Sequence, residues 1–177
     1  FFAVAGTLLL RRHYKLNALP VAGAARYMID ADKAQLATFG QLEGDTLIAT
    51  PEAFHCWVEC DGYAIDFMAP IFSESLAAAG MQQAIPRQMF QRRIAEMAKT
   101  SDELTHDGAF SLFPDQQRTM DVMQNFDAKN ASGDLANTCA HWYRRPPKKI
   151  PPTLDVANGA GQVRRLTLHG PEISGVW

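Results

Sequence analysis

Two residues that could do chemistry together, His55 and Asp66, stand on either side of an Asp61-Gly62 pair in a stretch rich in strand-forming residues. Asp-Gly favours the positive φ angles of a two-residue turn, which predicts a hairpin in which Trp57 pairs with Asp66. Side chains alternate along a strand, so His55 and Asp66 are expected on one face as diagonal neighbours. A carboxylate placed there orients an imidazole, and an imidazole oriented in this way is the base of a nucleophilic triad.

The remaining hairpin side chains divide between the two faces. Trp57 and Glu59 share the face of His55, where Trp57 is expected to line a substrate pocket or to cover the imidazole. The opposite face is interpreted as the core side; it carries Cys56, Val58, Cys60, Tyr63, Ile65 and Phe67. The competing interpretation of His55 and Asp66 is the ordinary polar face of an antiparallel pair.

The order of these residues resembles a known family. The pattern is similar to the histidine and aspartate strands of transglutaminase-like proteins, members of the papain-fold superfamily of cysteine enzymes. It consists of His55-x-Trp57-x-Glu59, a turn, and then Ile65-Asp66. The resemblance covers residues 1–67. It implies that His55 is the general base, that Asp66 orients it, and that the nucleophilic thiol lies at the N-terminus of an earlier helix. It also implies an α+β fold with a central N-terminal helix packed on an antiparallel sheet.

The start of the chain supplies that helix but no thiol. Residues 1–12 form a mostly apolar run that becomes basic at its end, which is typical of a buried helix. The run is apolar from its first residue and does not begin with Met, so the natural chain is expected to begin earlier, with a Cys just upstream of Phe1. The helix dipole favours the thiolate form of a Cys at a helix N-terminus.

Other elements follow from periodicity and from Gly and Pro. Residues 21–29 read as a loop entering a strand, 30–43 as a polar loop or single helical turn, and 46–50 as a short strand. Beyond the hairpin the pattern predicts a helical C-terminal half within a single domain of residues 1–177. Its helices are expected at about 74–79, 87–99, 114–126 and 134–143, with a loop at 129–133 and a late strand at 162–169.

The three cysteines are interpreted as core residues. Cys56 neighbours His55 in sequence, but alternation sends the two side chains to opposite faces, so Cys56 is a poor nucleophile for it. Cys56, Cys60, Cys139 and His141 are the one conceivable zinc set, and they lack Cys-x-x-Cys knuckles, so no metal is expected. No cofactor motif is present.

Composition limits the function classes. Hydrophobic residues make up 47%, charged residues 20%, and the net charge is −2, which gives no argument for nucleic acid or an acidic membrane surface. Three unevenly spaced cysteines favour a reducing, cytoplasmic setting, and no apolar run is long enough to span a bilayer. The basic loop from Arg144 to Lys149 is interpreted as solvated, although it could hold an anionic group.

Two functions from different classes remain. The first is a thiol-dependent hydrolase or acyltransferase acting on an amide, ester or thioester bond of a small-molecule or peptide substrate. The second is a catalytically inactive papain-fold module that serves binding or interaction. Composition does not decide the oligomeric state, and a Cys upstream of Phe1 would favour the enzyme.

Overall fold

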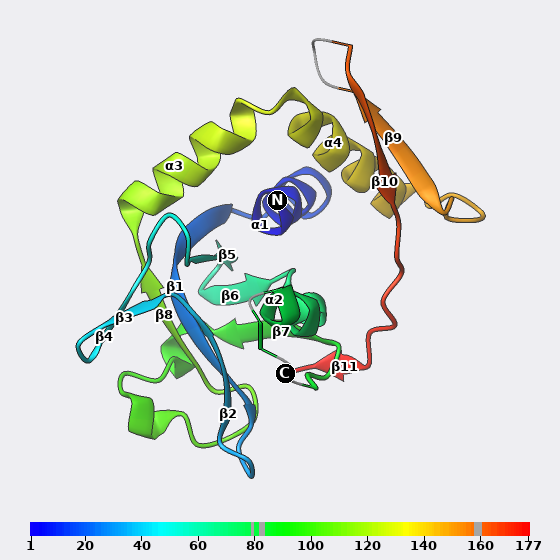
Figure 1. The fold of residues 1–177 in the computed structure, drawn as a ribbon. Coiled ribbons are helices and arrows are strands. Elements are labelled where there is room, and N and C mark those ends of the chain that lie inside the picture. The colour runs from blue at the N-terminus through cyan, green and yellow to red at the C-terminus, as the bar shows by residue number, and fades with distance from the viewer. Residues whose placement is uncertain (79, 82–83, 158–160) are drawn as a thin grey trace.

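The computed structural model describes residues 1–78, 80–81, 84–157 and 161–177, and it forms an α+β fold around one mixed sheet (Figure 1). The helices are α1 (Phe2–Leu9), which continues as a π-helical segment at Leu10–Tyr14, α2 (Phe72–Ala78), α3 (Gln116–Asp127) and α4 (Asn130–Arg144). Short 3-10 turns lie at Ala69–Ile71, Ile94–Glu96 and Ser101–Glu103.

Among the described residues, seven strands form the main sheet and four others form two smaller hairpins. They are β1 (Ala18–Asp30), β2 (Gln35–Phe39), β3 (Gln41–Glu43), β4 (Thr46–Ile48), β5 (His55–Cys60), β6 (Tyr63–Asp66), β7 (Gln88–Arg93), β8 (Phe110–Pro114), β9 (Thr153–Ala157), β10 (Val163–Thr167) and β11 (Gly175–Val176). In the main sheet β11, β7, β6, β5 and β1 follow one another, and β2 and β8 also pair with β1. β3 pairs with β4, and β9 with β10.

The long strand β1 organises the sheet. Gly23 pairs with both β5 and β8, and Ala25 pairs with both β8 and β2. A strand residue has one neighbour on each side, so β5 and β2 succeed each other along one edge of β1 while β8 occupies the other edge. Small residues at positions 22–25 allow this crowding.

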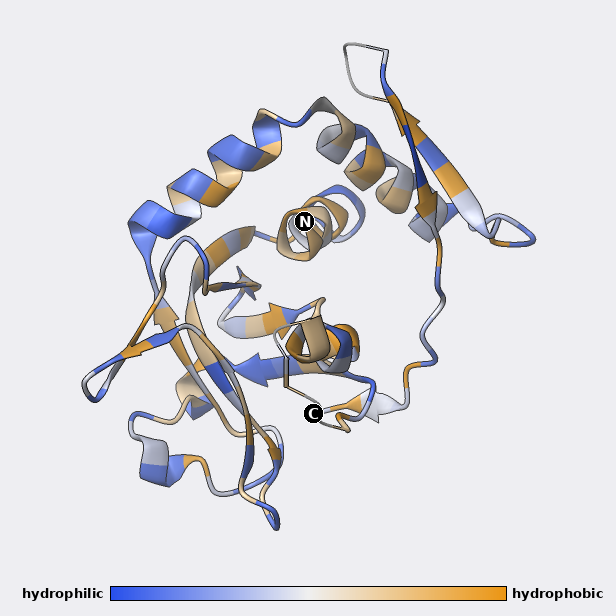
Figure 2. Ribbon diagram, in the orientation of Figure 1, coloured by the Kyte–Doolittle hydropathy of each residue, from blue (hydrophilic) through white to orange (hydrophobic). Residues whose placement is uncertain are grey.

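Both faces of the sheet are covered. On one face α1 packs against Val58 and Cys60, with Ile65 and Phe67 beside them. On the other face α2 places Phe72 and Leu76 against the largest hydrophobic cluster. Figure 2 shows hydrophobic residues concentrated in α1 and in the central strands. The sheet is therefore a middle layer, and the expectation that only the Cys56 face is core is wrong.

Two later helices cover α1 from outside. α3 begins after Asp115, whose carboxylate caps it by accepting a hydrogen bond from the Arg118 N–H at 2.9 Å. Thr119 Oγ1 accepts a hydrogen bond from the Ala22 N–H at 2.9 Å and so fixes α3 to β1. In Figure 1, α3 and α4 form an arc around α1, and the β9–β10 hairpin lies outside α4. The chain then returns, so that β11 pairs in parallel with β7.

Several expected elements differ. The prediction of a helix at 87–99 is wrong, because Gln88–Arg93 forms β7. This segment pairs with both β6 and β11, and the tertiary pairing overrides the helix propensity of its residues. The loop expected at 30–43 holds β2 and β3, and the loop at 129–133 lies mostly within α4. The described residues of the second half of the chain therefore form five strands beside the two long helices. Of the helix expected at 74–79, residue 79 lies outside the described residues.

Candidate active site

The hairpin forms as its turn residues dictate. Asp61 has φ of 48° and Gly62 of 79°, the positive pair that a type I′ turn requires. The strands pair Cys60 with Tyr63 and Val58 with Ile65, which is the predicted register. This register brings His55 and Asp66 to one face.

His55 and Asp66 form a direct, buried contact. The distance from His55 Nε2 to Asp66 Oδ2 is 2.5 Å, and the two residues are 2% and 0% exposed. An ionised Asp66 only accepts hydrogen bonds, so in that state a proton lies on Nε2 and the lone pair of a neutral His55 ring is on Nδ1. This tautomer is the one that a general base requires when a carboxylate orients it.

Two further donors hold the carboxylate of Asp66. The Tyr27 hydroxyl donates to Oδ2 at 2.9 Å, and the Met68 N–H donates to Oδ1 at 2.8 Å. Burial first, and then the charge of Asp66, raises the pKa of Tyr27 well above its ordinary value of 10.0. Tyr27 is therefore a neutral hydrogen-bond donor across the physiological range, and it restrains the carboxylate that faces His55.

Aromatic rings enclose the imidazole. The ring of Phe39 stacks on His55 with 4.3 Å between centroids, while Phe72 and Tyr27 approach at 5.6 and 5.7 Å. Register explains the stacking: His55 pairs with Gly23 and Phe39 with Ala25, two positions further along the same edge of β1. Side chains two residues apart share a face, so the two rings meet.

The enclosing residues were not predicted as part of the site. Phe39 lies in the segment expected as a loop, and Tyr27 reaches Asp66 across 39 positions of sequence. Trp57 requires a correction. It is 1% exposed, packs within the core and donates from Nε1 to Glu59 Oε1 at 3.1 Å, so it does not line an open pocket. Phe39, Phe72 and Tyr27 surround His55 where Trp57 was expected to cover it.

The three described thiols lie away from the imidazole. Cys56 and Cys60 pack on the α1 face of the sheet, opposite His55, and Cys139 lies on α4. Burial raises the pKa of Cys56 to about 11 and also raises those of Cys60 and Cys139. Raised pKa values are typical of unreactive structural thiols. In the described part of the chain, no three His, Cys, Asp or Glu residues are grouped to hold a metal ion.

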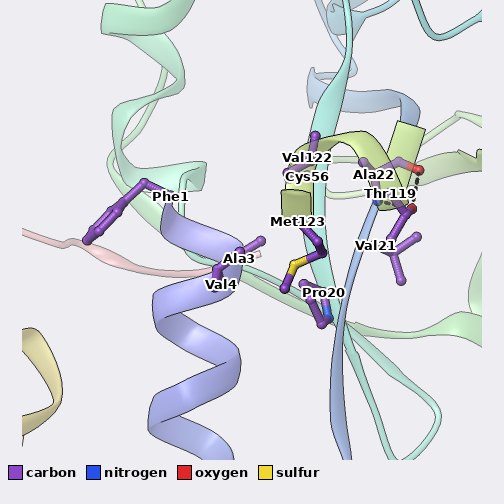
Figure 3. A pocket seen from close by; sticks show the side chains of 10 residues that line it. All are labelled: Phe1, Ala3, Val4, Pro20, Val21, Ala22, Cys56, Thr119, Val122 and Met123. Atoms are coloured by element: carbon purple, nitrogen blue, oxygen red, sulfur yellow. Dashed lines mark hydrogen bonds between the residues drawn. The ribbon is translucent and has the colours of Figure 1, made fainter. Parts of the chain in front are cut away.

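Cys56 lines a small apolar pocket between α1, β1, β5 and α3 (Figure 3). Phe1, Ala3 and Val4 of the helix end line it together with Met123 and Val122 of α3. Its volume is only 10 Å³, about the room of one water molecule. The first turn of α1 therefore lies beside the start of β5, one residue from His55, but on the opposite face of that strand.

These features define an α+β protein whose central sheet holds a buried histidine–aspartate–tyrosine network. The model of the family described as "Protein of unknown function (DUF2026)" matches residues 1–177, and the chain belongs to this family. A solved structure described as "The crystal structure of genomics APC5867" is 34% identical, with a TM-score of 0.79, over 99% of this chain and 82% of that one. No curated protein matches. Among the described residues, none of the helices has both the length and the apolar character needed to cross a membrane.

Proposed function

We propose that the protein is a thiol-dependent hydrolase or acyltransferase in which His55 and Asp66 are two members of a Cys-His-Asp triad. The observation that carries the proposal is the 2.5 Å contact between His55 Nε2 and Asp66 Oδ2, on a carboxylate that Tyr27 and Met68 also hold. Chain order supports a papain-like core, because a helix packed on the sheet precedes the histidine strand and the adjacent aspartate strand.

The chemistry would proceed through an acyl-enzyme. The thiol passes its proton to Nδ1 of His55 and its sulfur attacks the carbonyl carbon of an amide, ester or thioester in a small-molecule or peptide substrate. The imidazolium then returns the proton to the leaving group. Water or an amine then attacks the acyl carbon and passes a proton to His55, the C–S bond breaks, and His55 returns that proton to the departing thiolate. Asp66 stabilises the imidazolium throughout and keeps the proton of its own contact on Nε2.

The proposal takes the thiol from residues preceding Phe1, since none of the three described thiols faces His55. The first turn of α1 lies near the start of β5, which brings the preceding residues to that end of the strand. A thiol in these residues can reach the face of β5 that carries His55 only around the end of the strand at Phe54. Thiol chemistry of this kind suits a reducing, cytoplasmic setting.

Labelling of the natural protein, including the residues before Phe1, tests the proposal. We expect iodoacetamide to modify one thiol upstream of Phe1 rapidly at neutral pH. His55→Ala should slow that reaction by about 100-fold or more, the size of a general-base effect. Cys56→Ala is the matched control and should leave the rate unchanged. A natural protein with no rapidly labelled upstream thiol would contradict the proposal.

A second function, a non-catalytic binding module, is favoured by one observation. The imidazole is 2% exposed beneath Phe39 and Phe72, so His55 and Asp66 also fit a purely structural network. In that case His55→Ala lowers stability and changes the reactivity of no thiol. Measuring unfolding and labelling on the same variant separates the two functions.

A further inference from the structure

Basic side chains from two segments far apart in the sequence meet at one cavity. Arg12 and His13 come from the π-helical segment that continues α1, and His141 and Arg144 come from the last turn of α4, with Arg145 at its C-cap. Together with Ala140 these residues line a cavity of 220 Å³. The cavity lies at the end of α1 opposite to Phe1, so it is separate from His55.

The arginines of this cavity, Arg12, Arg144 and Arg145, have no carboxylate within ion-pair distance in the part of the chain that the structure describes. The sequence explains this: no Asp or Glu precedes Asp30, and Asp134 is the one acidic residue between positions 128 and 154. In a chain of net charge −2, such a concentration of positive charge makes a local field that attracts anions.

Helix dipoles account for only part of this arrangement. A cation near the C-terminus of a helix is favourable, so each basic group taken singly suits its own helix end. Placing the two basic ends against one cavity adds repulsion between like charges, which an anion between them would remove.

The walls of the cavity are tied together. The Ala140 carbonyl only accepts, so His13 donates to it from Nε2, at 2.9 Å. Arg12 donates to Asn137 Oδ1 at 3.4 Å, and the hydroxyls of Tyr14 and Tyr143 are in contact. The ring of His13, which lines the cavity, lies 5.5 Å from the ring of Tyr143.

We propose that this cavity binds the phosphoryl group of a phosphate monoester. Guanidinium groups present paired donors that match the oxygens of a phosphate, and three of them suit a dianion better than a single carboxylate. The ring of His13, which lines the cavity, would contact the organic part of the ester. The site is independent of the thiol chemistry proposed above.

Titration of the full chain followed by NMR tests the site with two sources of the same group. Phenyl phosphate presents it free in solution, and phosphatidic acid vesicles present it at a lipid surface. We expect phenyl phosphate to shift the backbone amides of residues 11–15 and 140–145 saturably, and benzoate to do so much more weakly. If the protein is retained on the vesicles and phenyl phosphate displaces it, the natural source of the group is a lipid. If the vesicles do not retain the protein, the source is a soluble ester. Failure of phenyl phosphate to bind, or equal binding of benzoate, would overturn the proposal.

Variants locate the binding. Arg12→Gln and Arg144→Gln should each weaken phenyl phosphate binding at least about tenfold, since each removes a charge-assisted contact. Arg144→Lys keeps the charge but loses the paired donors, so its affinity for phenyl phosphate should lie between those of the parent and of Arg144→Gln. Arg164→Gln, at an exposed arginine on β10, is the matched control and should bind as the parent does. If Arg12→Gln lowers the melting temperature, Arg145→Gln replaces it, and equal loss in Arg164→Gln contradicts the site.

Discussion

Gly23 faces Phe113 so closely that an added Cβ at Gly23 would lie 2.1 Å from the Phe113 carbonyl oxygen. Gly23 also pairs with His55 across β1 and β5. The strand β5, which carries His55, therefore pairs with a residue of β1 that has no room for a side chain beside β8. Both contacts lie in the backbone, where little adjustment is available.

Gly23→Ala is expected to destabilise the protein. Because the colliding atom belongs to the backbone of β8, the strands must separate, at a cost of about 1–3 kcal/mol or more. Urea unfolding measures the change. Gly133 is the control: it lies within α4, and an added Cβ there meets nothing within 4 Å. Gly133→Ala should instead stabilise by roughly 0.5–1 kcal/mol through helix propensity, and equal effects at the two sites would refute the argument.

Asp66→Ala should be among the most destabilising substitutions in the chain. It leaves His55 Nε2, the Tyr27 hydroxyl and the Met68 N–H without their acceptor in a buried site. Breaking a buried pair of this kind costs about 3–5 kcal/mol, measurable by denaturant unfolding. Asp66→Asn, which keeps one acceptor oxygen, should cost less. Asp61→Asn, at the exposed turn where φ is 48°, should change stability little, since Asn accepts that conformation.

Tyr27→Phe should alter the dependence of stability on alkaline pH. The folded pKa of Tyr27 is raised, so the folded protein retains a proton that the unfolded chain loses above about pH 10. The contribution of Tyr27 to the free energy of unfolding is therefore fully present below about pH 10. Above that pH it falls by up to about 1.4 kcal/mol per pH unit, until the pH reaches the folded pKa. Tyr27→Phe should lack this component. Tyr63→Phe should retain it, and parallel stability curves for the parent and Tyr27→Phe would count against the assignment.

The thiols of residues 1–177 should react slowly with iodoacetamide at neutral pH. A pKa of about 11 leaves Cys56 as thiolate in about one molecule in ten thousand at pH 7. Burial also raises the pKa values of Cys60 and Cys139. Mass spectrometry of the modified chain measures each rate. In urea all three should react rapidly and alike, and fast modification of folded Cys56 would be inconsistent with the structure.

Local sequence determined the hairpin but not its surroundings. Asp61-Gly62 restricts the backbone to one turn type, and alternation then brings His55 and Asp66 to one face without reference to the rest of the chain. Tyr27, Phe39 and Phe72 reach the imidazole only through the pairing of β1 with β5 and β2 and through the packing of α2. Such contacts depend on register between distant segments, which no short pattern encodes. The same dependence explains β7, where Gln88–Arg93 has helix-forming residues and pairs as a strand.

The hydrogen bond from His13 to Ala140 joins residues 127 positions apart, and Tyr14 meets Tyr143 across 129. Closing a loop of that length carries an entropy cost before its contacts can offset it, so such contacts form late. The packing of α1 against α4 is therefore expected to be among the last contacts to form during folding. Substitutions where α1 meets α4 should accordingly accelerate unfolding more than they slow refolding.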